Sequence, residues 1–450
     1  MNYPRVYAMR ITLFVVSLCA VAVCASQVRE RPALSASVYG NYRVGNDQMI
    51  GIDRFVMDDG QDAVLYTEYH SGVVRRLFKV ADNEFEMGPG FNTQTPAELK
   101  IQVERDAKGG VTGVHLQPAA GAGKFAVRTA ITETTVEIAN GPVRLAGTLM
   151  VPGTGGPHPA IILLHGSGPL TRYSFGPYPH FFTSLGFAVL VFDKRGTGDS
   201  TGTRLDSSTG APDPLPEENF PERLASDAHA AIAFLRQRKD IDARRIGLWG
   251  SSEGGMLTTQ VAARDKRIAF AINSSGFMGP LYETTLYQAG LSLRRNGFTE
   301  EQIAEVKAAT VRWVDAARTG QGVEQVFKER DDALRENKGW LVGWTRLDIS
   351  STAQLRWLWD HVLSFSPLPA LADVKCPVLA LYGELDTSTD AEKAAGNIRS
   401  VLTAAGHRDF TVRVIPNASH SLMEQPSGNR MAPGVFETLS TWLHDRVRTQ

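Results

Sequence analysis

Two continuous apolar runs, at residues 160–164 (AIILL) and 188–192 (AVLVF), constrain the fold of this chain more than any other feature. Strands without polar alternation are buried on both faces, as in mostly parallel sheets that helices cover. Helical spacing follows at residues 222–238. Further strand patterns lie at residues 246–249, 378–382 and 410–414, and a further helical pattern lies at residues 254–263. This alternation predicts an α/β sheet with right-handed crossovers from about residue 132 onward.

Residues 26–131 are predicted to form a separate N-terminal β-domain. Short segments in this region alternate apolar and polar side chains and are rich in β-branched and aromatic residues. They lie at residues 49–56, 63–70, 73–80, 99–105, 111–116 and 124–131. Turn sequences such as Asp58-Asp59-Gly60 separate them, and no helical periodicity interrupts them. The pattern predicts a small antiparallel barrel or sandwich.

The alternation of strand and helix pauses between about residues 277 and 372, where the pattern is helical. Trp313, Trp340, Trp344, Trp357 and Trp359 lie in this segment. We expect a helical cap, inserted into a catalytic domain of residues 132–450 and folded over the strand ends, where ligands bind in open α/β sheets. The tryptophans are expected either to wall an apolar pocket or to fill the core of the cap itself.

The first 25 residues are predicted to be a signal peptide. Arg5 and Arg10 form a positive region before an apolar run of about fourteen residues, at 11–24, which is short for a membrane span. Cleavage before Ser26 would yield a periplasmic or secreted protein with no stable membrane insertion. Lipid attachment at Cys24 and a cytosolic protein with an apolar N-terminal helix are the alternatives. After cleavage Cys376 is the single cysteine left, which excludes an intramolecular disulfide.

The net charge and the residue spacing argue against nucleic acid, metal and phosphate-loop ligands. A formal net charge of −1 leaves no basic footprint, so no nucleic-acid partner is expected. His, Cys, Asp and Glu show no metal-ligand spacing, so neither a metal nor another cofactor is expected. Residues 193–200 (DKRGTGDS) lack the ending of a phosphate loop and are predicted to form a structural turn pinned by Asp193 and Arg195. The sequence gives no indication of the oligomeric state.

Gly250-Ser251-Ser252-Glu253-Gly254 is a G-x-S-x-G motif between a predicted strand and a predicted helix. The serine of such a motif occupies a sharp, strained turn, and its glycines let neighbouring backbones pass. The N-terminus of the following helix favours the negative charge that develops during reaction. We therefore predict that Ser252 is a catalytic nucleophile.

A serine nucleophile needs a base, which an acid orients. In this strand–turn–helix setting the acid follows a late strand and the histidine follows the last one. Asp386 follows the run that ends at residue 382, and His420 follows the run that ends near residue 415. We predict Asp386 as the acid and His420 as the base. Asp390 and Glu384 compete with Asp386, although Asp390 also suits the start of a helix.

Two backbone amides must stabilise the developing oxyanion. The amide of Glu253, directly after the nucleophile, is one candidate. The other is expected in the glycine-rich loop that follows the strand ending at Leu164. We assign Ser167 as this donor, with Gly166 as the alternative, and expect His165 to brace the loop.

Together these motifs resemble the esterase branch of the alpha/beta-hydrolase superfamily, near dienelactone-hydrolase-like and acetyl-esterase-like bacterial enzymes. The matching segments are LAGTL at 145–149, LHGSG at 164–168, DKRGTG at 193–198, the G-x-S-x-G motif, and NASH at 417–420. In such families the residue after His-Gly and the residue after the nucleophile supply the oxyanion amides, which supports Ser167 and Glu253. The helical insertion also resembles the cap of that family. The resemblance does not extend to the N-terminal β-domain.

The leading functional hypothesis is a serine hydrolase that cleaves small or short-acyl carboxylic esters through an acyl-enzyme on Ser252. A serine exopeptidase or oligopeptidase of the prolyl-oligopeptidase type is the first alternative. The N-terminal β-structure, of about one hundred residues, is too short for the propeller that such peptidases carry. The second alternative is a non-catalytic cell-envelope binding protein on a hydrolase scaffold.

Overall fold

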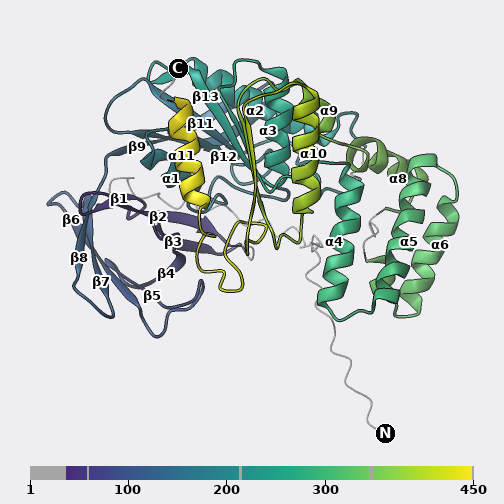
Figure 1. Ribbon diagram of the computed structural model, residues 1–450, viewed down its shortest axis with the longest axis horizontal. Coiled ribbons are helices and arrows are strands. Elements are labelled where there is room, and N and C mark those ends of the chain that lie inside the picture. Colours follow the sequence, from purple (N-terminus) through teal and green to yellow (C-terminus); the bar gives the residue numbers. More distant parts are fainter. Residues whose placement is uncertain (1–36, 58–59, 212–214, 344–348, 448–450) are drawn as a thin grey trace, which may run out of the picture.

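The computed structural model describes residues 37–57, 60–211, 215–343 and 349–447. The predicted signal peptide, with Cys24 and Ser26, lies outside these residues. No helix within the described ranges is both long and apolar enough to cross a membrane. The strands form two sheets, a closed barrel and an eight-stranded open sheet (Figure 1).

The N-terminal barrel consists of antiparallel strands. They are β1 (Gly40–Val44), β2 (Gln48–Val56), β3 (Asp62–Glu68), β4 (Val74–Ala81), β5 (Glu84–Met87), β6 (Leu99–Arg105), β7 (Val111–Pro118) and β8 (Lys124–Arg128). Pairing of β1 with β8 closes the barrel, which leaves no free sheet edge. Side chains such as Tyr42, Ile52 and Ile101 fill its interior. The predicted antiparallel barrel is confirmed.

The barrel departs from the sequence pattern in three strands. The pattern does not reveal β1 and β5, because four or five residues are too few to establish an alternation. The strand predicted at residues 124–131 ends at Arg128, and Ile131 begins a strand of the other sheet. Thr129 donates its backbone N–H to Asn41 O at 2.8 Å where the chain leaves the barrel. The apolar pattern continues through this turn, so the pattern alone predicts one strand where the structure has two.

The second sheet is mostly parallel. Its strands are β9 (Ile131–Asn140), β10 (Val143–Pro152), β11 (His158–Leu164), β12 (Ala188–Phe192), β13 (Ile241–Ser251), β14 (Ala271–Ser274), β15 (Val378–Gly383) and β16 (Phe410–Ile415). Their spatial order is β16-β15-β14-β13-β11-β12-β10-β9, with β9 and β10 antiparallel at one edge. The two continuous apolar runs form β11 and β12, which are buried along nearly their whole length. The predicted α/β architecture is confirmed.

Helices cover the open sheet and form the cap. The sheet helices are α1 (Tyr178–Ser184), α2 (Phe220–Arg236), α3 (Glu253–Arg264), α9 (Leu368–Asp373), α10 (Ala391–Ala404) and α11 (Val435–Val447). The cap contains α4 (Leu281–Arg295), α5 (Glu300–Thr319), α6 (Val323–Arg335), α7 (Gly339–Val342), α8 (Thr352–Leu358) and the π-helical turn η2 (Trp359–Leu363). Figure 1 shows the cap at one end of the sheet domain and the barrel at the other.

The barrel is packed on the sheet domain through a shared apolar cluster. Leu65 and Val74 of the barrel belong to the same buried cluster as Phe181 of α1, Trp249 of β13 and Phe436 of α11. Such continuous burial stabilises the contact by roughly 1.5–3 kcal/mol for each large apolar side chain that it removes from water. The two domains therefore share part of one hydrophobic core.

A buried ion pair crosses the same interface. His180 Nδ1 of α1 lies 2.6 Å from Asp53 Oδ1 of β2, and His180 Nε2 lies 3.5 Å from Glu133 Oε1 of β9. Burial alone lowers the pKa of His180, but the two carboxylates outweigh it and raise that pKa to about 10. Burial also raises the pKa of Asp53, so the pair retains its proton at neutral pH. The pair restricts how the two surfaces meet, because another arrangement would leave a buried charge without its partner.

Candidate active site

Ser252 lies in a strained turn between β13 and α3. Its φ and ψ angles are 55° and −120°, a combination that non-glycine residues rarely adopt. A Cβ on Gly250 would lie 2.1 Å from Gly254 O, and a Cβ on Gly254 would lie 2.1 Å from Leu164 O. Both glycines are required because the ends of β11 and β13 and the start of α3 converge at this turn.

His420 and Asp386 come together from two strand ends. Asp386 follows β15, His420 follows β16, and His420 Nδ1 lies 2.8 Å from Asp386 Oδ2. Asp386 Oδ1 accepts hydrogen bonds from the backbone N–H groups of Ser388 and Thr389, at 2.7 and 2.8 Å. The carboxylate is fully buried, whereas the imidazole is partly exposed. A carboxylate at Nδ1 keeps the proton on that nitrogen and leaves Nε2 as the basic one.

The two competing carboxylates have other partners. Asp390 caps α10 by accepting a hydrogen bond from Lys393 N at 3.1 Å. Glu384 accepts one from Asn417 N at 2.9 Å and so ties the end of β15 to the loop that carries His420. Within the part of the chain that the structure describes, Asp386 is the carboxylate bonded to the imidazole of His420.

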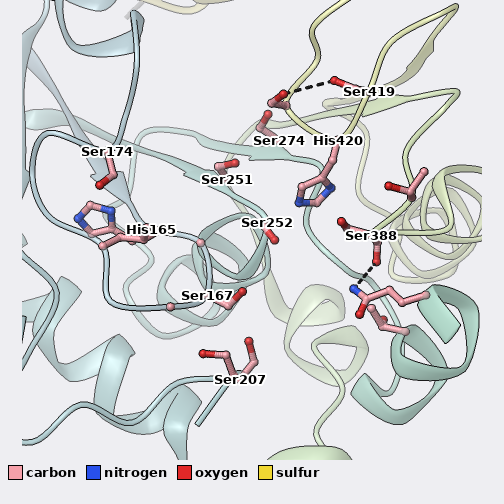
Figure 2. A pocket seen from close by; sticks show the side chains of 18 of the residues that line it. His165, Ser167, Ser174, Ser207, Ser251, Ser252, Ser274, Ser388, Ser419 and His420 are labelled. Atoms are coloured by element: carbon pink, nitrogen blue, oxygen red, sulfur yellow. Dashed lines mark hydrogen bonds between the residues drawn. The ribbon is translucent and has the colours of Figure 1, made fainter. Parts of the chain in front are cut away.

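Ser252 and His420 line the same cavity, which has a volume of about 1430 Å³. Figure 2 shows Ser252 between Ser167 on one side and His420 on the other. The cavity wall includes residues of the barrel, the sheet domain and the cap. Among the described residues, no Asp or Glu lines it, and its two charged residues are Arg204 and Arg295.

The cap tryptophans divide between the two roles expected of them. Of those that the structure describes, Trp313 lines the cavity. Trp340, Trp357 and Trp359 pack against other apolar residues, mainly of the cap. Trp344 lies outside the described residues. Most of the described tryptophans therefore fill the core of the cap and its contact with the sheet domain.

The loop after β11 packs directly on the turn that holds Ser252. A Cβ on Gly166 would lie 3.3 Å from Ser252 Cβ. His165 is stacked on Phe175, with 4.1 Å between the ring centres, and its Nε2 lies 2.6 Å from Phe192 O. Burial lowers the pKa of His165 to about 3, so its ring is neutral and braces the loop.

The sequence interpretation of residues 193–200 overlooked Lys194. Asp193 and Arg195 do pin this turn. Asp193 accepts hydrogen bonds from the backbone N–H groups of Arg172 and Asp199, and Arg195 pairs with Asp227 at 2.6 Å. Lys194 points inward and is buried. From the sequence, a lysine between two charged turn residues is expected to be exposed to solvent. Its burial could not be predicted locally, because its partners lie far away in the sequence.

Lys194 contacts both segments that carry the predicted oxyanion donors. Its Nζ donates to Gly166 O at 2.8 Å and to Glu253 Oε1 at 2.6 Å. The peptide between Gly166 and Ser167 is planar and trans, so anchoring Gly166 O on Lys194 directs the Ser167 N–H the opposite way. The amide of Glu253 opens α3, where backbone N–H groups have no partner within the helix. One ammonium therefore links two separate segments, through the backbone carbonyl of Gly166 in one and through the side chain of Glu253 in the other.

Opposite charges balance around this ammonium. Lys194 Nζ also lies 3.1 Å from Asp206 Oδ2, and Arg204 lies 3.0 Å from the same oxygen. Burial raises the pKa of Asp206, but Lys194 and Arg204 outweigh it and lower that pKa. Burial dominates at Glu253 and raises its pKa, although Lys194 opposes the shift. The cluster is costly to disturb, because removing a partner leaves a buried charge uncompensated.

The comparison with known families assigns the chain. A model described as the alpha/beta hydrolase family matches residues 161–428, which is more than half of the chain. The chain belongs to the alpha/beta hydrolase family. The match begins within β11 and includes the Ser252 turn, the cap, Asp386 and His420, and the barrel lies before it. The protein is therefore a hydrolase.

Three curated relatives are similar to this alpha/beta hydrolase. An uncharacterized 31.7 kDa protein in the traX-finO intergenic region of Escherichia coli is 32% identical over 254 residues, 55% of this chain and 80% of the relative. Thiohydrolase aneE of Aspergillus aculeatus is 30% identical over 38% of this chain and 44% of its own length. Esterase EstD of Thermotoga maritima is 33% identical over 27% of this chain and 28% of its own length. The chain thus spans less than half of the two relatives with named activities.

We expect Lys194→Met to lower the kcat of this alpha/beta hydrolase about a hundredfold with little change in KM, because displacing the amides by about 1 Å acts mainly on the transition state. Steady-state kinetics measure both constants. Lys239→Met, which removes an exposed lysine, is the matched control and should leave kcat unchanged.

Lys194→Met also leaves the buried carboxylate of Glu253 without its cation and leaves Asp206 with Arg204 alone, which lowers the free energy of unfolding by about 3–5 kcal/mol. Each variant is therefore assayed at a temperature well below the midpoint of its own thermal unfolding. A wild-type kcat in folded Lys194→Met protein would contradict the positioning role.

Proposed function

We propose that this hydrolase cleaves carboxylic esters through an acyl-enzyme on Ser252. One observation carries the proposal: the strained serine and the imidazole of His420 line one cavity, and that imidazole is bonded to the buried carboxylate of Asp386. Nucleophile, base and orienting acid are the groups that acyl transfer through a serine requires.

In the proposed reaction, Ser252 Oγ attacks the acyl carbon while His420 Nε2 takes the hydroxyl proton. Asp386 holds the Nδ1 proton in place and stabilises the imidazolium. His420 then gives its proton to the oxygen of the departing alcohol, and the acyl group stays on Ser252. A water molecule, deprotonated by the same imidazole, attacks the acyl carbon. The bond to Ser252 Oγ breaks, the imidazolium returns the proton to that oxygen, and the carboxylic acid is released.

The backbone N–H groups of Ser167 and Glu253 are the proposed oxyanion donors, with Gly166 N–H as the alternative to Ser167. The close packing of Gly166 on Ser252 and the anchoring of both segments on Lys194 support this assignment. Donors held in place before reaction need no reorganisation when the charge forms.

The lining of the cavity favours an ester over a peptide. An exopeptidase that removes residues from the N-terminus has to bind the α-ammonium group of its substrate, and a carboxylate is the side chain suited to this task. The described cavity wall offers none. The names of two relatives, an esterase and a thiohydrolase, agree with transfer of an acyl group from an ester or thioester to water. For the acyl side of the substrate we propose a short chain.

Ser252→Ala is expected to fold normally and to lose about 10⁴- to 10⁶-fold in turnover, because only binding and oxyanion effects remain. A fluorophosphonate probe should label the wild-type protein at Ser252, as peptide mass mapping would detect. Wild-type turnover in the alanine variant, or labelling at Ser251, would contradict the assignment.

The kcat/KM for p-nitrophenyl acetate or butyrate is expected to exceed that for aminoacyl p-nitroanilides by at least about a hundredfold, a gap of roughly 2.7 kcal/mol. Activated aryl esters favour every serine hydrolase, so the stricter comparison sets an unactivated alkyl ester against a matched dipeptide. Faster cleavage of the dipeptide would establish the peptidase alternative instead.

We also propose that the mature chain begins at Ser26 and lies in the periplasm or outside the cell. The basic and apolar pattern of the first 25 residues supports this proposal. Intact mass of the protein from each cell fraction decides the matter. A start at Cys24 with attached lipid would establish the lipoprotein alternative, and an uncleaved chain would rule out both.

A further inference from the structure

The barrel contributes one wall of the active-site cavity. Phe55 of β2, Leu65 of β3, Val74 of β4 and Phe91 after β5 all line the cavity that contains Ser252. Leu65 and Val74 are buried, whereas Phe55 and Phe91 keep part of their surface exposed. All four side chains are apolar, so this wall can bind only an apolar group favourably.

The same part of the barrel also holds the loop that carries His420. Val74 N donates to Asn429 O at 2.9 Å, and Met431 N donates to Gly72 O at 2.7 Å. An antiparallel bridge joins Val73 to Arg430 between these bonds. The turn between β3 and β4 is thus paired with residues 429–431 as a short strand would be.

A second set of contacts continues from this docking point to the histidine. Met431 forms an antiparallel bridge with Met423, and Ser419 N donates to Met423 O at 2.9 Å. The turn closed by this bond presents His420. Met423 and Met431 also line the cavity. The apolar wall of the barrel therefore adjoins the histidine through two methionines, which adapt readily to differently shaped apolar groups.

The position of His420 determines which half of an ester lies near this wall. The histidine gives its proton to the oxygen of the departing alcohol, so that oxygen must come within hydrogen-bond reach of Nε2. The alcohol half of the substrate consequently extends along the His420 side of the cavity. That side leads to Met423, Met431 and the barrel.

The size of the cavity agrees with a substrate that has two halves of different size. Ligand pockets commonly measure about 300–1,000 Å³, and this cavity measures about 1430 Å³. A short acyl group at Ser252 would fill little of it.

We propose that the barrel forms the alcohol-binding subsite, and that the natural substrates are short-acyl esters of bulky apolar alcohols, aromatic or branched. This proposal rests on the ester-hydrolase function proposed above. In it, Phe55 and Phe91 determine specificity, and the N-terminal β-domain is part of the active site.

The test uses the full-length mature protein and two series of unactivated esters. One series keeps the acetyl group and enlarges the alcohol from ethyl through benzyl to naphthylmethyl. The other keeps ethanol and lengthens the acyl chain from acetyl to octanoyl. We expect wild-type kcat/KM to rise at least about tenfold along the alcohol series, because each added apolar group gains contact with the wall.

Phe91→Ser and Phe55→Ser are expected to lower kcat/KM for naphthylmethyl acetate at least about tenfold more than that for ethyl acetate. Phe91→Leu, which keeps an apolar side chain, should give an intermediate loss and serves if the serine variants fail to fold. Phe125→Ser is the matched control, because Phe125 lies on β8, is 39% exposed and does not line the cavity. It should leave both series unchanged.

The outcomes separate this proposal from the one on which it rests. If esters are cleaved and Ser252 is labelled, but the barrel variants change neither series, the alcohol subsite is wrong. If they change the acyl series instead, the barrel binds the acyl chain, and the proposal is also overturned. If no ester of either series is cleaved and Ser252 is not labelled, the proposed function itself fails.

Discussion

The whole site depends on the close approach of three backbones at the Ser252 turn. Gly250 and Gly254 allow β13, β11 and the start of α3 to meet at distances that no side chain permits. This convergence holds Ser252 at positive φ and packs the Gly166 loop against it. Strain of this kind persists only where the surrounding structure over-determines the conformation. The buried strands on both sides of β13 supply that constraint.

A second level of support comes from a buried cluster of charges beneath the turn. Lys194, from the end of β12, contacts the loop after β11 and the first residue of α3 at the same time. The direction of a backbone N–H depends on the adjacent peptide groups and not on the residue's own side chain. The neighbouring carbonyl groups and the rest of the loop therefore have to be held in place. A charged hydrogen bond in a dry environment is well suited to this task because it is strong and directional. The proposed mechanism therefore relies on a residue that touches no reacting atom.

Several contacts join the barrel and the sheet domain, among them a shared apolar cluster, the His180–Asp53 pair and backbone pairing with residues 429–431. The last of these begins nine residues after His420, in the same loop. A domain outside the family match thus helps to hold the loop of a residue inside it. This arrangement gives the N-terminal β-domain a role in the geometry of the site as well as in stability.

Local pattern was sufficient for the strand–helix alternation, the antiparallel N-terminal β-domain and the G-x-S-x-G turn, because burial, pleat and turn chemistry act over a few residues. It did not decide between a barrel and a sandwich, because closure depends on the pairing of β1 with β8. The order of elements along the chain also pointed to Asp386 and His420, whose pairing the sequence could suggest but not measure. Short strands such as β1 and β5 carried too little periodicity to be seen. Lys194, the partners of His180 and the barrel wall of the cavity were decided only by tertiary structure. Each depends on residues far apart in sequence that meet when the sheets pack, and no local pattern encodes such a meeting.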